Sequence, residues 1–235
     1  MAAETGSQGV KAVEDDDLAE ADESFEGVTP DAARRLLLGA VEAFAERGFH
    51  ATTTRDIAGR AGMSPAALYI HYKTKEELLF QISKVGHERS VSVLAEAADA
   101  SGGGQSGSSG MSDSDRLARA VRQFVRWHAE HHTTARVVQY ELAALGEEHY
   151  EEIVALRRRS EEILRGVLES GDASGEFEVA DIRGTTLAVM SLCIDVARWY
   201  SPSGRRTPDE IGRLYADLVL RMVASAGPSR AGQPG

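Results

Sequence analysis

The residues whose side chains are best suited to binding a partner lie between Thr53 and Lys75, where hydroxyl and basic side chains recur at helical spacing. Arg55 stands near the start of a predicted helix, where its guanidinium could bind a phosphate or donate two hydrogen bonds to the edge of a guanine. Thr53 and Thr54 precede it and could donate to a phosphate at the same helix terminus. Each also has a plainer explanation, because threonines cap helices and many exposed arginines contribute nothing measurable. The pattern predicts contacts to a nucleic-acid backbone, with a purely structural role as the alternative.

These side chains require two short helices joined by a tight turn, and residues 52–78 contain the signals for both. Ala58 is small enough to let two helices approach, and Gly62 tolerates the positive φ that such a turn needs. Ser64 caps the second helix and a proline opens it, at the position where the missing N–H costs nothing. Leu68 supplies the apolar side chain that pins the second helix on the first. This arrangement is typical of a helix-turn-helix that binds DNA.

The second of these helices presents little that could hydrogen-bond a base. Ser64, Ala66 and Ala67 face outward near its start, and the two alanines can offer only methyl contacts, which suit thymine. Such sparse direct readout predicts that DNA shape contributes to specificity.

The distribution of charge agrees with this placement, although the whole chain carries a formal net charge of −11. Residues 1–29 hold nine acidic side chains and one lysine, whereas residues 30–90 hold nine basic and seven acidic ones. The helix-turn-helix therefore lies in the only net-positive part of the chain, as phosphate contact requires. We interpret residues 1–28 as a disordered acidic tail. The alternative is a tail that covers the DNA-binding face and weakens non-specific binding.

The remainder of the pattern predicts an all-α protein of about nine helices, because no segment alternates with the period of a strand. Gly48 is expected to end the first helix, and Gly171 with Gly175 to break the chain after the seventh. The predicted helices cover roughly residues 30–47, 54–61, 64–72, 74–98, 113–131, 133–145, 147–170, 179–200 and 207–223.

We therefore divide the chain into two domains. Residues 29–75 are the predicted three-helix DNA-binding domain with the helix-turn-helix, and residues 76–226 a C-terminal helical domain for ligand binding and dimerisation. The second domain is interrupted by a flexible loop rich in glycine and serine at residues 100–112. Residues 227–235 are predicted to be a disordered tail.

Composition excludes several classes of protein. Nothing approaches the apolar run of about 20 residues that crosses a bilayer, and the acidic N-terminus does not resemble a signal peptide. The single Cys193 excludes a disulfide framework within the chain and a multi-cysteine zinc site. Phosphate-binding loops, nucleophile elbows and paired-carboxylate signatures are absent from the sequence, so we expect neither an enzyme nor a bound cofactor. A cytoplasmic location is the simplest expectation.

Histidines in the C-terminal half raise the question of a metal site. His128 and His132 are four residues apart and share a helix face, and Glu141 or His149 could complete a ligand set. No HExxH pattern supports this, and histidines near helix ends more often cap carbonyl groups. We therefore expect no bound metal.

The string AGMSPAALYIHYKTKEELL, with the helix ending in AERGFHATT before it, resembles the TetR family of bacterial transcriptional regulators over roughly residues 30–82. The resemblance implies a homodimer formed through the last two helices. It also implies that a small molecule in the C-terminal domain moves the DNA-binding units apart and releases a palindromic operator. By the same resemblance Tyr69, His71 and Lys75 hold the DNA backbone, and these side-chain types can straddle adjacent phosphates. A core role is the alternative for Tyr69, although Tyr72 is the better candidate for it.

The string DVARWYSPSGRRTPDEIGRLY at residues 195–215 resembles actinobacterial regulators of lipid and sterol breakdown that respond to acyl-CoA thioesters. This second resemblance implies that Arg198 helps to hold the ligand. Met190 stands where that branch carries a further arginine.

Two arginines are the candidates for binding an anionic group of the effector. Arg157 falls on the apolar stripe of its helix, so we expect it to be buried and to need an anionic partner, either Glu141, Asp195 or the ligand. Arg198 lies three residues after Asp195, which is also a ligand-binding candidate, and an ordinary intrahelical pair is the alternative for Asp195 and Arg198. The remaining ligand-binding candidates are Trp127, Tyr140, Met190 and Trp199, which with Cys193 could line a pocket or a dimer core.

The sequence as a whole favours a ligand-responsive dimeric repressor of transcription. Its effector is expected to be a small hydrophobic molecule, with an acyl-CoA thioester of fatty-acid or sterol catabolism as the leading candidate. A non-CoA hydrophobic ligand or drug acting on the same fold is the alternative. Outside this class, a helical adaptor that uses its acidic tail for protein contacts is the remaining possibility.

Overall fold

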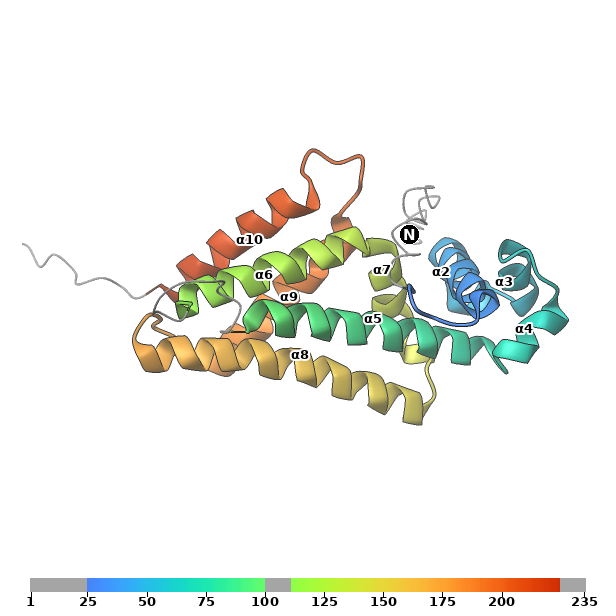
Figure 1. Cartoon of the computed structure of the whole chain (residues 1–235), viewed down its shortest axis with the longest axis horizontal. Helices are drawn as coiled ribbons and strands as arrows, with labels where there is room; N and C mark the ends of the chain where they lie inside the picture. Colours follow the sequence, from blue (N-terminus) through green and yellow to red (C-terminus); the bar gives the residue numbers. More distant parts are fainter. Residues whose placement is uncertain (1–24, 100–110, 225–235) are drawn as a thin grey trace, which may run out of the picture. The chain divides into compact units, whose positions relative to one another are not determined.

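The computed structural model describes residues 25–99 and 111–224, and over these residues the protein is all-α (Figure 1). Nine α-helices and one short 3-10 helix account for the described chain. A single β-bridge between Phe177 and Ala224 is the only extended pairing in these residues. The predicted fold class is therefore confirmed. The helices are α2 (Asp31–Ala51), α3 (Thr54–Arg60), α4 (Pro65–His71), α5 (Lys75–Ala98), α6 (Asp113–Glu130), α7 (His132–Glu141), η2 (Leu142–Ala144), α8 (Glu147–Ser174), α9 (Ile182–Trp199) and α10 (Pro208–Val223).

The chain folds into two compact units. Within the described residues the first unit comprises 25–86 and 131–153, and the second comprises 87–99, 111–130 and 154–224. The first unit extends beyond the predicted boundary at Lys75, because Leu78 and Ile82 of α5 enter the same core as α2. Helix α7 adds Val137 to this core. No helix of the described residues is long and apolar enough to cross a membrane.

The first unit is built on a close approach between α2 and α3. A Cβ atom on Gly39 would lie 2.9 Å from the Ile57 carbonyl oxygen and 3.2 Å from the Ala61 backbone nitrogen. Only a residue without a side chain fits here, which allows Ile57 and Leu68 to be fully buried against α2. Ala58, the small residue that the sequence pointed to, is also fully buried.

The end of α2 follows the prediction. Gly48 has φ 76° and ψ 164°, so helical geometry stops there although hydrogen bonding of the helical type resumes to Ala51. Phe49 folds back so that its ring centroid lies 5.4 Å from that of Phe44. Thr52 secures the turn by donating from its hydroxyl to the Gly48 carbonyl oxygen at 2.8 Å.

The folded part of the first unit begins earlier than the sequence suggested. Phe25 is fully buried in the core that includes Leu36 and Leu37, and Val28 packs against the same core. Residues 25–28 of the predicted tail therefore belong to the folded unit, because the aromatic side chain of Phe25 is buried in its core. Residues 1–24 of that tail, residues 100–110 of the predicted loop and the predicted tail at 227–235 lie outside the described residues.

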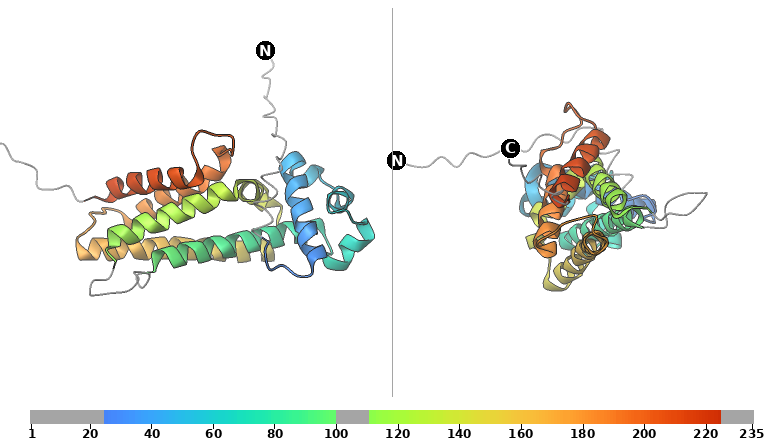
Figure 2. Two further views of the ribbon diagram at one scale, coloured as in Figure 1. Left: turned by 45° about the horizontal axis from the view of Figure 1, so that its top comes forward. Right: turned by 90° about the vertical axis from the view of Figure 1, so that its left-hand side faces the viewer.

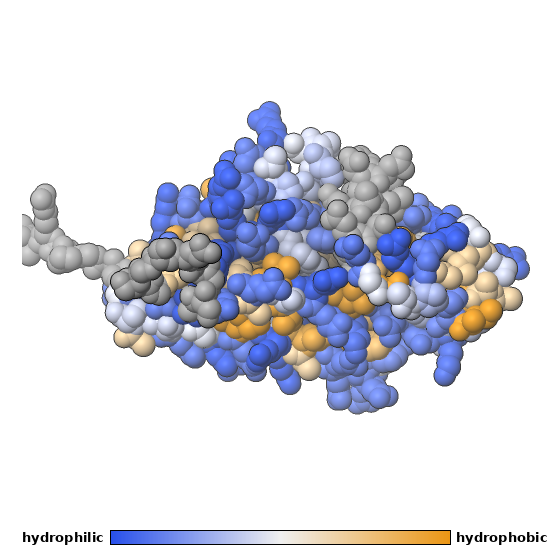
Figure 3. Space-filling view, in the orientation of Figure 1, coloured by the Kyte–Doolittle hydropathy of each residue, from blue (hydrophilic) through white to orange (hydrophobic). Residues whose placement is uncertain are grey.

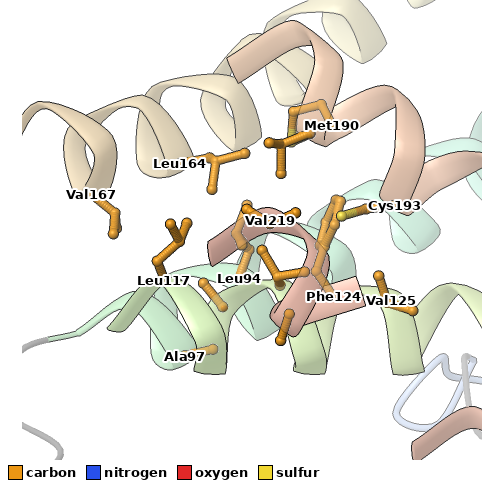
Figure 4. Packing of buried hydrophobic residues seen from close by; sticks show 14 of the residues in the cluster. Leu94, Ala97, Leu117, Phe124, Val125, Leu164, Val167, Met190, Cys193 and Val219 are labelled. Atoms are coloured by element: carbon orange, nitrogen blue, oxygen red, sulfur yellow. The ribbon is translucent and has the colours of Figure 1, made fainter. Parts of the chain in front are cut away.

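The second unit encloses a separate apolar core. Side chains from α5, α6, α8, α9 and α10 point into one cluster, with Leu94, Phe124, Leu164, Cys193 and Val219 among those visible in Figure 4. Helix α10 packs closely along α6 (Figure 2), and a Cβ on Gly212 would lie 2.6 Å from the Arg122 carbonyl oxygen. The Arg122 side chain also donates to the Asp209 carboxylate, at 2.9 and 2.6 Å, at the start of α10.

The predicted break at Gly171 is wrong, because α8 continues through it to Ser174. The glycine is needed for packing instead. A Cβ at this position would lie 2.0 Å from the Phe177 ring, which is buried over the helix. Positive φ occurs at Gly175, where the helix has ended.

Candidate nucleic-acid interface

The start of α3 is organised by a reciprocal pair of hydrogen bonds. The Thr53 hydroxyl accepts from the Asp56 backbone N–H at 3.2 Å, while the Asp56 carboxylate accepts from the Thr53 N–H at 2.9 Å and from its hydroxyl at 2.7 Å. These bonds keep the pKa of Asp56 below its ordinary value. The capping role of Thr53 is thus confirmed, and its contact to phosphate stays a prediction.

The turn between α3 and α4 has the predicted geometry. Gly62 has φ 65°, and the Met63 N–H donates to the Ala58 carbonyl oxygen at 2.8 Å. Arg35 of α2 donates to the Ala61 carbonyl oxygen, which ties the turn to the first helix. Ser64 caps α4 by accepting from the Ala67 N–H at 3.2 Å, with Pro65 at the first helical position. The sequence pattern therefore identified the roles of Gly62, Ser64 and Pro65 in this turn, whereas it did not predict the contact from Arg35.

Helix α4 separates its buried and exposed residues clearly. Leu68 is fully buried, and Tyr72 is buried with its hydroxyl donating to the Ala33 carbonyl oxygen at 3.3 Å. Burial raises the pKa of Tyr72 to about 12. Tyr69 instead is 53% exposed, and its hydroxyl lies 3.1 Å from that of Thr54. Tyr72 therefore fills the core position, and Tyr69 links the exposed surfaces of α3 and α4.

The predicted DNA-contacting residues mostly gather on this exposed surface. Arg55 on α3 is exposed, as are Ser64, Ala66 and Tyr69 around α4, whereas Ala67 and His71 are half-buried. Sequence reasoning overlooked Ile70, which is 79% exposed between Tyr69 and His71. Its helical spacing of four residues from Ala66 was the available signal.

Lys75 differs from the other predicted contacts because its ammonium group is held by the protein. It donates to the Thr52 carbonyl oxygen at 2.7 Å and to the Phe49 carbonyl oxygen, and it lies 4.2 Å from the centre of the Phe49 ring. Partial burial lowers the pKa of Lys75, and the Glu141 charge opposes this shift. Lys75 thus joins the end of α2 to the start of α5, and a phosphate would compete with these carbonyl groups.

The effector candidates do not share one environment. The expectation that Arg157 is buried is wrong: no side chain of residues 155–159 is buried, because this turn of α8 belongs to neither apolar core. Arg198 forms two hydrogen bonds with Asp195, at 2.7 and 3.0 Å, so the intrahelical pair is confirmed. This pairing keeps the pKa of Asp195 below its ordinary value.

The aromatic and sulfur-containing candidates for ligand binding also differ in burial. Met190 and Cys193 are buried in the second core, where burial raises the pKa of the Cys193 thiol to about 12. Trp127 is half-buried, with its ring edge-on to that of His128 at 5.0 Å. Trp199 and Tyr140 are exposed, the latter in the first unit. The packing therefore assigns Met190 to the core and Trp199 to a surface.

The histidines of the metal hypothesis are engaged elsewhere. His128 is buried, and its Nδ1 lies 2.8 Å from the Phe124 carbonyl oxygen. His149 stacks on Phe80, and its Nδ1 lies 2.8 Å from the Glu76 carboxylate. Among the described residues no group of three or more potential metal ligands comes together.

Comparison with known proteins places this helix-turn-helix in a family. Residues 31–82 match the model of the bacterial regulatory proteins of the tetR family, and residues 110–223 match the tetracycline repressor-like C-terminal domain. A solved bacterial regulatory protein of the TetR family from Rhodococcus RHA1 is 41% identical with a TM-score of 0.76, and the alignment covers 83% of this chain and 98% of that one. The chain belongs to the TetR family. The first match covers α2, α3, α4 and the start of α5, and the second covers α6 to α10.

Two further TetR relatives share one name. The HTH-type transcriptional repressor KstR2 of Rhodococcus jostii is 29% identical over 81% of this chain and 90% of its own length. The structure of the ketosteroid transcriptional regulator KstR2 of Mycobacterium tuberculosis is 25% identical with a TM-score of 0.73, and covers 84% of this chain and 97% of that one. This TetR-family chain is accordingly a transcriptional regulator, and its DNA-binding element is the α3–turn–α4 segment.

Proposed function

We propose that this protein is a dimeric repressor that binds a palindromic operator and is released by an acyl-CoA thioester of fatty-acid or sterol catabolism. The observation that carries the DNA-binding part is the exposed surface of α3 and α4, which presents Arg55 and Tyr69 while Ile57 and Leu68 of the same helices are fully buried. It acts in the cytoplasm by binding rather than by catalysis.

The operator contacts follow from how this surface is built. The capped start of α3 presents backbone N–H groups and Arg55 toward an approaching phosphate. The hydrogen bond between Thr54 and Tyr69 orients the phenol, which can contact the backbone beside the major groove. Leu68 and Tyr72 hold α4 from behind, so its outward side chains keep a fixed register against the bases.

The dimer is proposed to form through α9 and α10, where large apolar side chains are exposed on the second unit. Both helices also contribute buried side chains to the second core, so their exposed apolar residues lie on the outward side of that core. Such a surface is stabilised when a second copy covers it. The exposed apolar residues are Leu187, Leu192, Trp199, Leu218 and Met222.

The choice of effector rests on the similarity to the KstR2 proteins. It also rests on the resemblance of residues 195–215, stated from the sequence, to acyl-CoA-responsive regulators. Arg157 is exposed within a run of three arginines, and its charge is therefore accessible to a phosphate group of CoA. Arg198 can bind the same ligand only by exchanging its Asp195 partner for the anion. A non-CoA hydrophobic ligand acting on the same fold remains the alternative.

Replacing Arg55 with alanine is expected to weaken operator binding. If Arg55 contacts a guanine, affinity for the operator should fall by about 5- to 150-fold. If it contacts a phosphate, affinity should fall by a similar factor for every DNA sequence. In the phosphate case the slope of log affinity against log salt falls by about one. Fluorescence anisotropy with the DNA upstream of the gene, titrated at several salt concentrations, measures both. Arg159→Ala, which removes an exposed arginine of α8, is the matched control. Unchanged affinity and slope for Arg55→Ala would remove Arg55 from the interface.

Replacing Arg157 or Arg198 with alanine is expected to reduce DNA release by long-chain acyl-CoA about 10-fold or more, because each charge–anion contact contributes about 1.5–3 kcal/mol. Operator affinity without acyl-CoA is expected to stay unchanged. Palmitoyl-CoA, palmitate and free CoA are titrated against the protein–DNA complex. Arg165→Ala, on the same helix, is the control. Release by palmitate as effective as release by palmitoyl-CoA would support the non-CoA alternative instead.

A further inference from the structure

We infer that Ile70 reads the operator sequence by placing its side chain against the 5-methyl group of a thymine in the major groove. The inference rests on the proposed DNA-binding function and assigns one base-reading contact within it. The side chain of Ile70 belongs to neither apolar core of the described residues.

The position of Ile70 on α4 points to this role. The buried residues Leu68 and Tyr72 lie four residues apart on one face, and Ala66 and Ile70 lie four residues apart on the other. Ile70 is 79% exposed, the highest exposure among the large apolar residues that the structure leaves at the surface. Figure 3 shows an orange, strongly hydrophobic area where α4 lies in Figure 1, bordered by pale orange and blue surface. The outward face of α4 is therefore apolar where it would enter the groove.

The chemistry of isoleucine selects its partner. The side chain has no donor or acceptor, so it cannot bind a phosphate or the polar edge of guanine, adenine or cytosine. Thymine is the base that presents an apolar group in the major groove. Contact with that methyl group removes apolar surface of both partners from water, which is favourable in proportion to the area buried.

The neighbours of Ile70 support a contact of this kind. Tyr69 is oriented by its hydrogen bond to Thr54, and His71 is half-buried at the end of α4, so both sides of Ile70 are positioned by the fold. Because Leu68 is fully buried beneath them, the helix cannot rotate to bury Ile70 instead. An exposed β-branched residue does not stabilise a helix by its propensity. We therefore assign the role of Ile70 to a contact with DNA in the complex.

The test uses DNA selected by the wild-type protein from a pool of random duplexes, in which each thymine of the recovered site is replaced singly by deoxyuridine. This replacement removes only the methyl group. We expect one thymine in each half-site at which the wild-type protein loses about 4-fold in affinity per methyl group. Ile70→Ala should bind the thymine duplex more weakly by a similar factor and should no longer distinguish thymine from deoxyuridine there. Ile70→Val, which keeps an apolar branched side chain, should retain part of the discrimination.

The outcomes distinguish failure of the Ile70–thymine contact from failure of the proposed DNA-binding function. If no shared sequence is recovered from the pool, the proposed DNA-binding function and this inference both fail. If a site is recovered but no thymine is sensitive to deoxyuridine, or Ile70→Ala keeps the sensitivity of the wild type, the inference fails while the proposed function stands. Circular dichroism of Ile70→Ala should match the wild type, because an exposed side chain is removed.

Discussion

Replacing Leu218 and Met222 with aspartate is expected to give a folded monomer that no longer binds its operator tightly. These side chains are 44% and 48% exposed on α10, so charge at their positions is tolerated in a single chain. In a dimer the same positions become buried, and unpaired carboxylates there would have to lose their hydration. Four new negative charges in one interface are expected to raise the dimer Kd by at least about 1000-fold.

Loss of the dimer removes the advantage of binding two half-sites together. That advantage typically amounts to about 10²–10⁴ in affinity, so operator binding should fall by a comparable factor. Sedimentation velocity gives the oligomeric state, and anisotropy on the same samples gives the affinity. Tyr150→Asp, at an aromatic residue that is also 44% exposed but lies in the first unit, is the matched control and should stay dimeric. A double aspartate variant that sediments as a dimer would show that α10 lies outside the interface.

The second large effect is expected at Gly39. A valine there places its Cβ 2.9 Å from the Ile57 carbonyl oxygen and its two methyl groups farther into α3. No rotamer relieves a clash between Cβ and backbone, so α3 must move away from α2. We expect a loss of roughly 3 kcal/mol or more in the stability of the first unit, at or above the upper end of the range for overpacked cores. Operator binding should be lost while the second unit stays folded.

Gly59 on α3 provides the contrasting substitution. A Cβ at that position meets nothing within 4 Å, and alanine is favoured over glycine within helices by up to about 1 kcal/mol. Gly59→Ala should therefore raise the melting temperature of the first unit slightly, whereas Gly39→Val should lower it by many degrees. Hydrogen exchange followed separately on the two units distinguishes local from global loss of structure. Equal stability of Gly39→Val and the wild type would mean that α2 and α3 are not packed as described.

Features that depend on neighbouring residues in the chain could be predicted well. The cap at Thr53, the positive φ of Gly62, the cap at Ser64 and the start of α10 at Thr207 all rest on contacts within four residues. Side-chain type and spacing are sufficient for such contacts, because their geometry is set by the local backbone. Tyr72 was also the better candidate for the buried tyrosine, and it is buried directly after α4.

Features that depend on distant segments could not be predicted in the same way. Gly171 was expected to end a helix by its propensity, yet α8 continues because Phe177 packs against its bare backbone. Arg157 follows an apolar spacing, yet it is exposed because no core faces that turn of α8. Lys75 carries the charge expected of a phosphate contact, yet the carbonyl groups of Thr52 and Phe49 already occupy its ammonium.

The sequence by itself determined the all-α class and the helix-turn-helix, because periodicity and capping signals depend on residues close together in the chain. The TetR resemblance came separately, from the string AGMSPAALYIHYKTKEELL. Tertiary structure alone decided which glycine permits two helices to touch, which charged groups are already paired, and that Ile70 stands in solvent on the DNA-facing helix. Burial is a property of the segments that surround a side chain, and those segments are brought together only when the chain has folded.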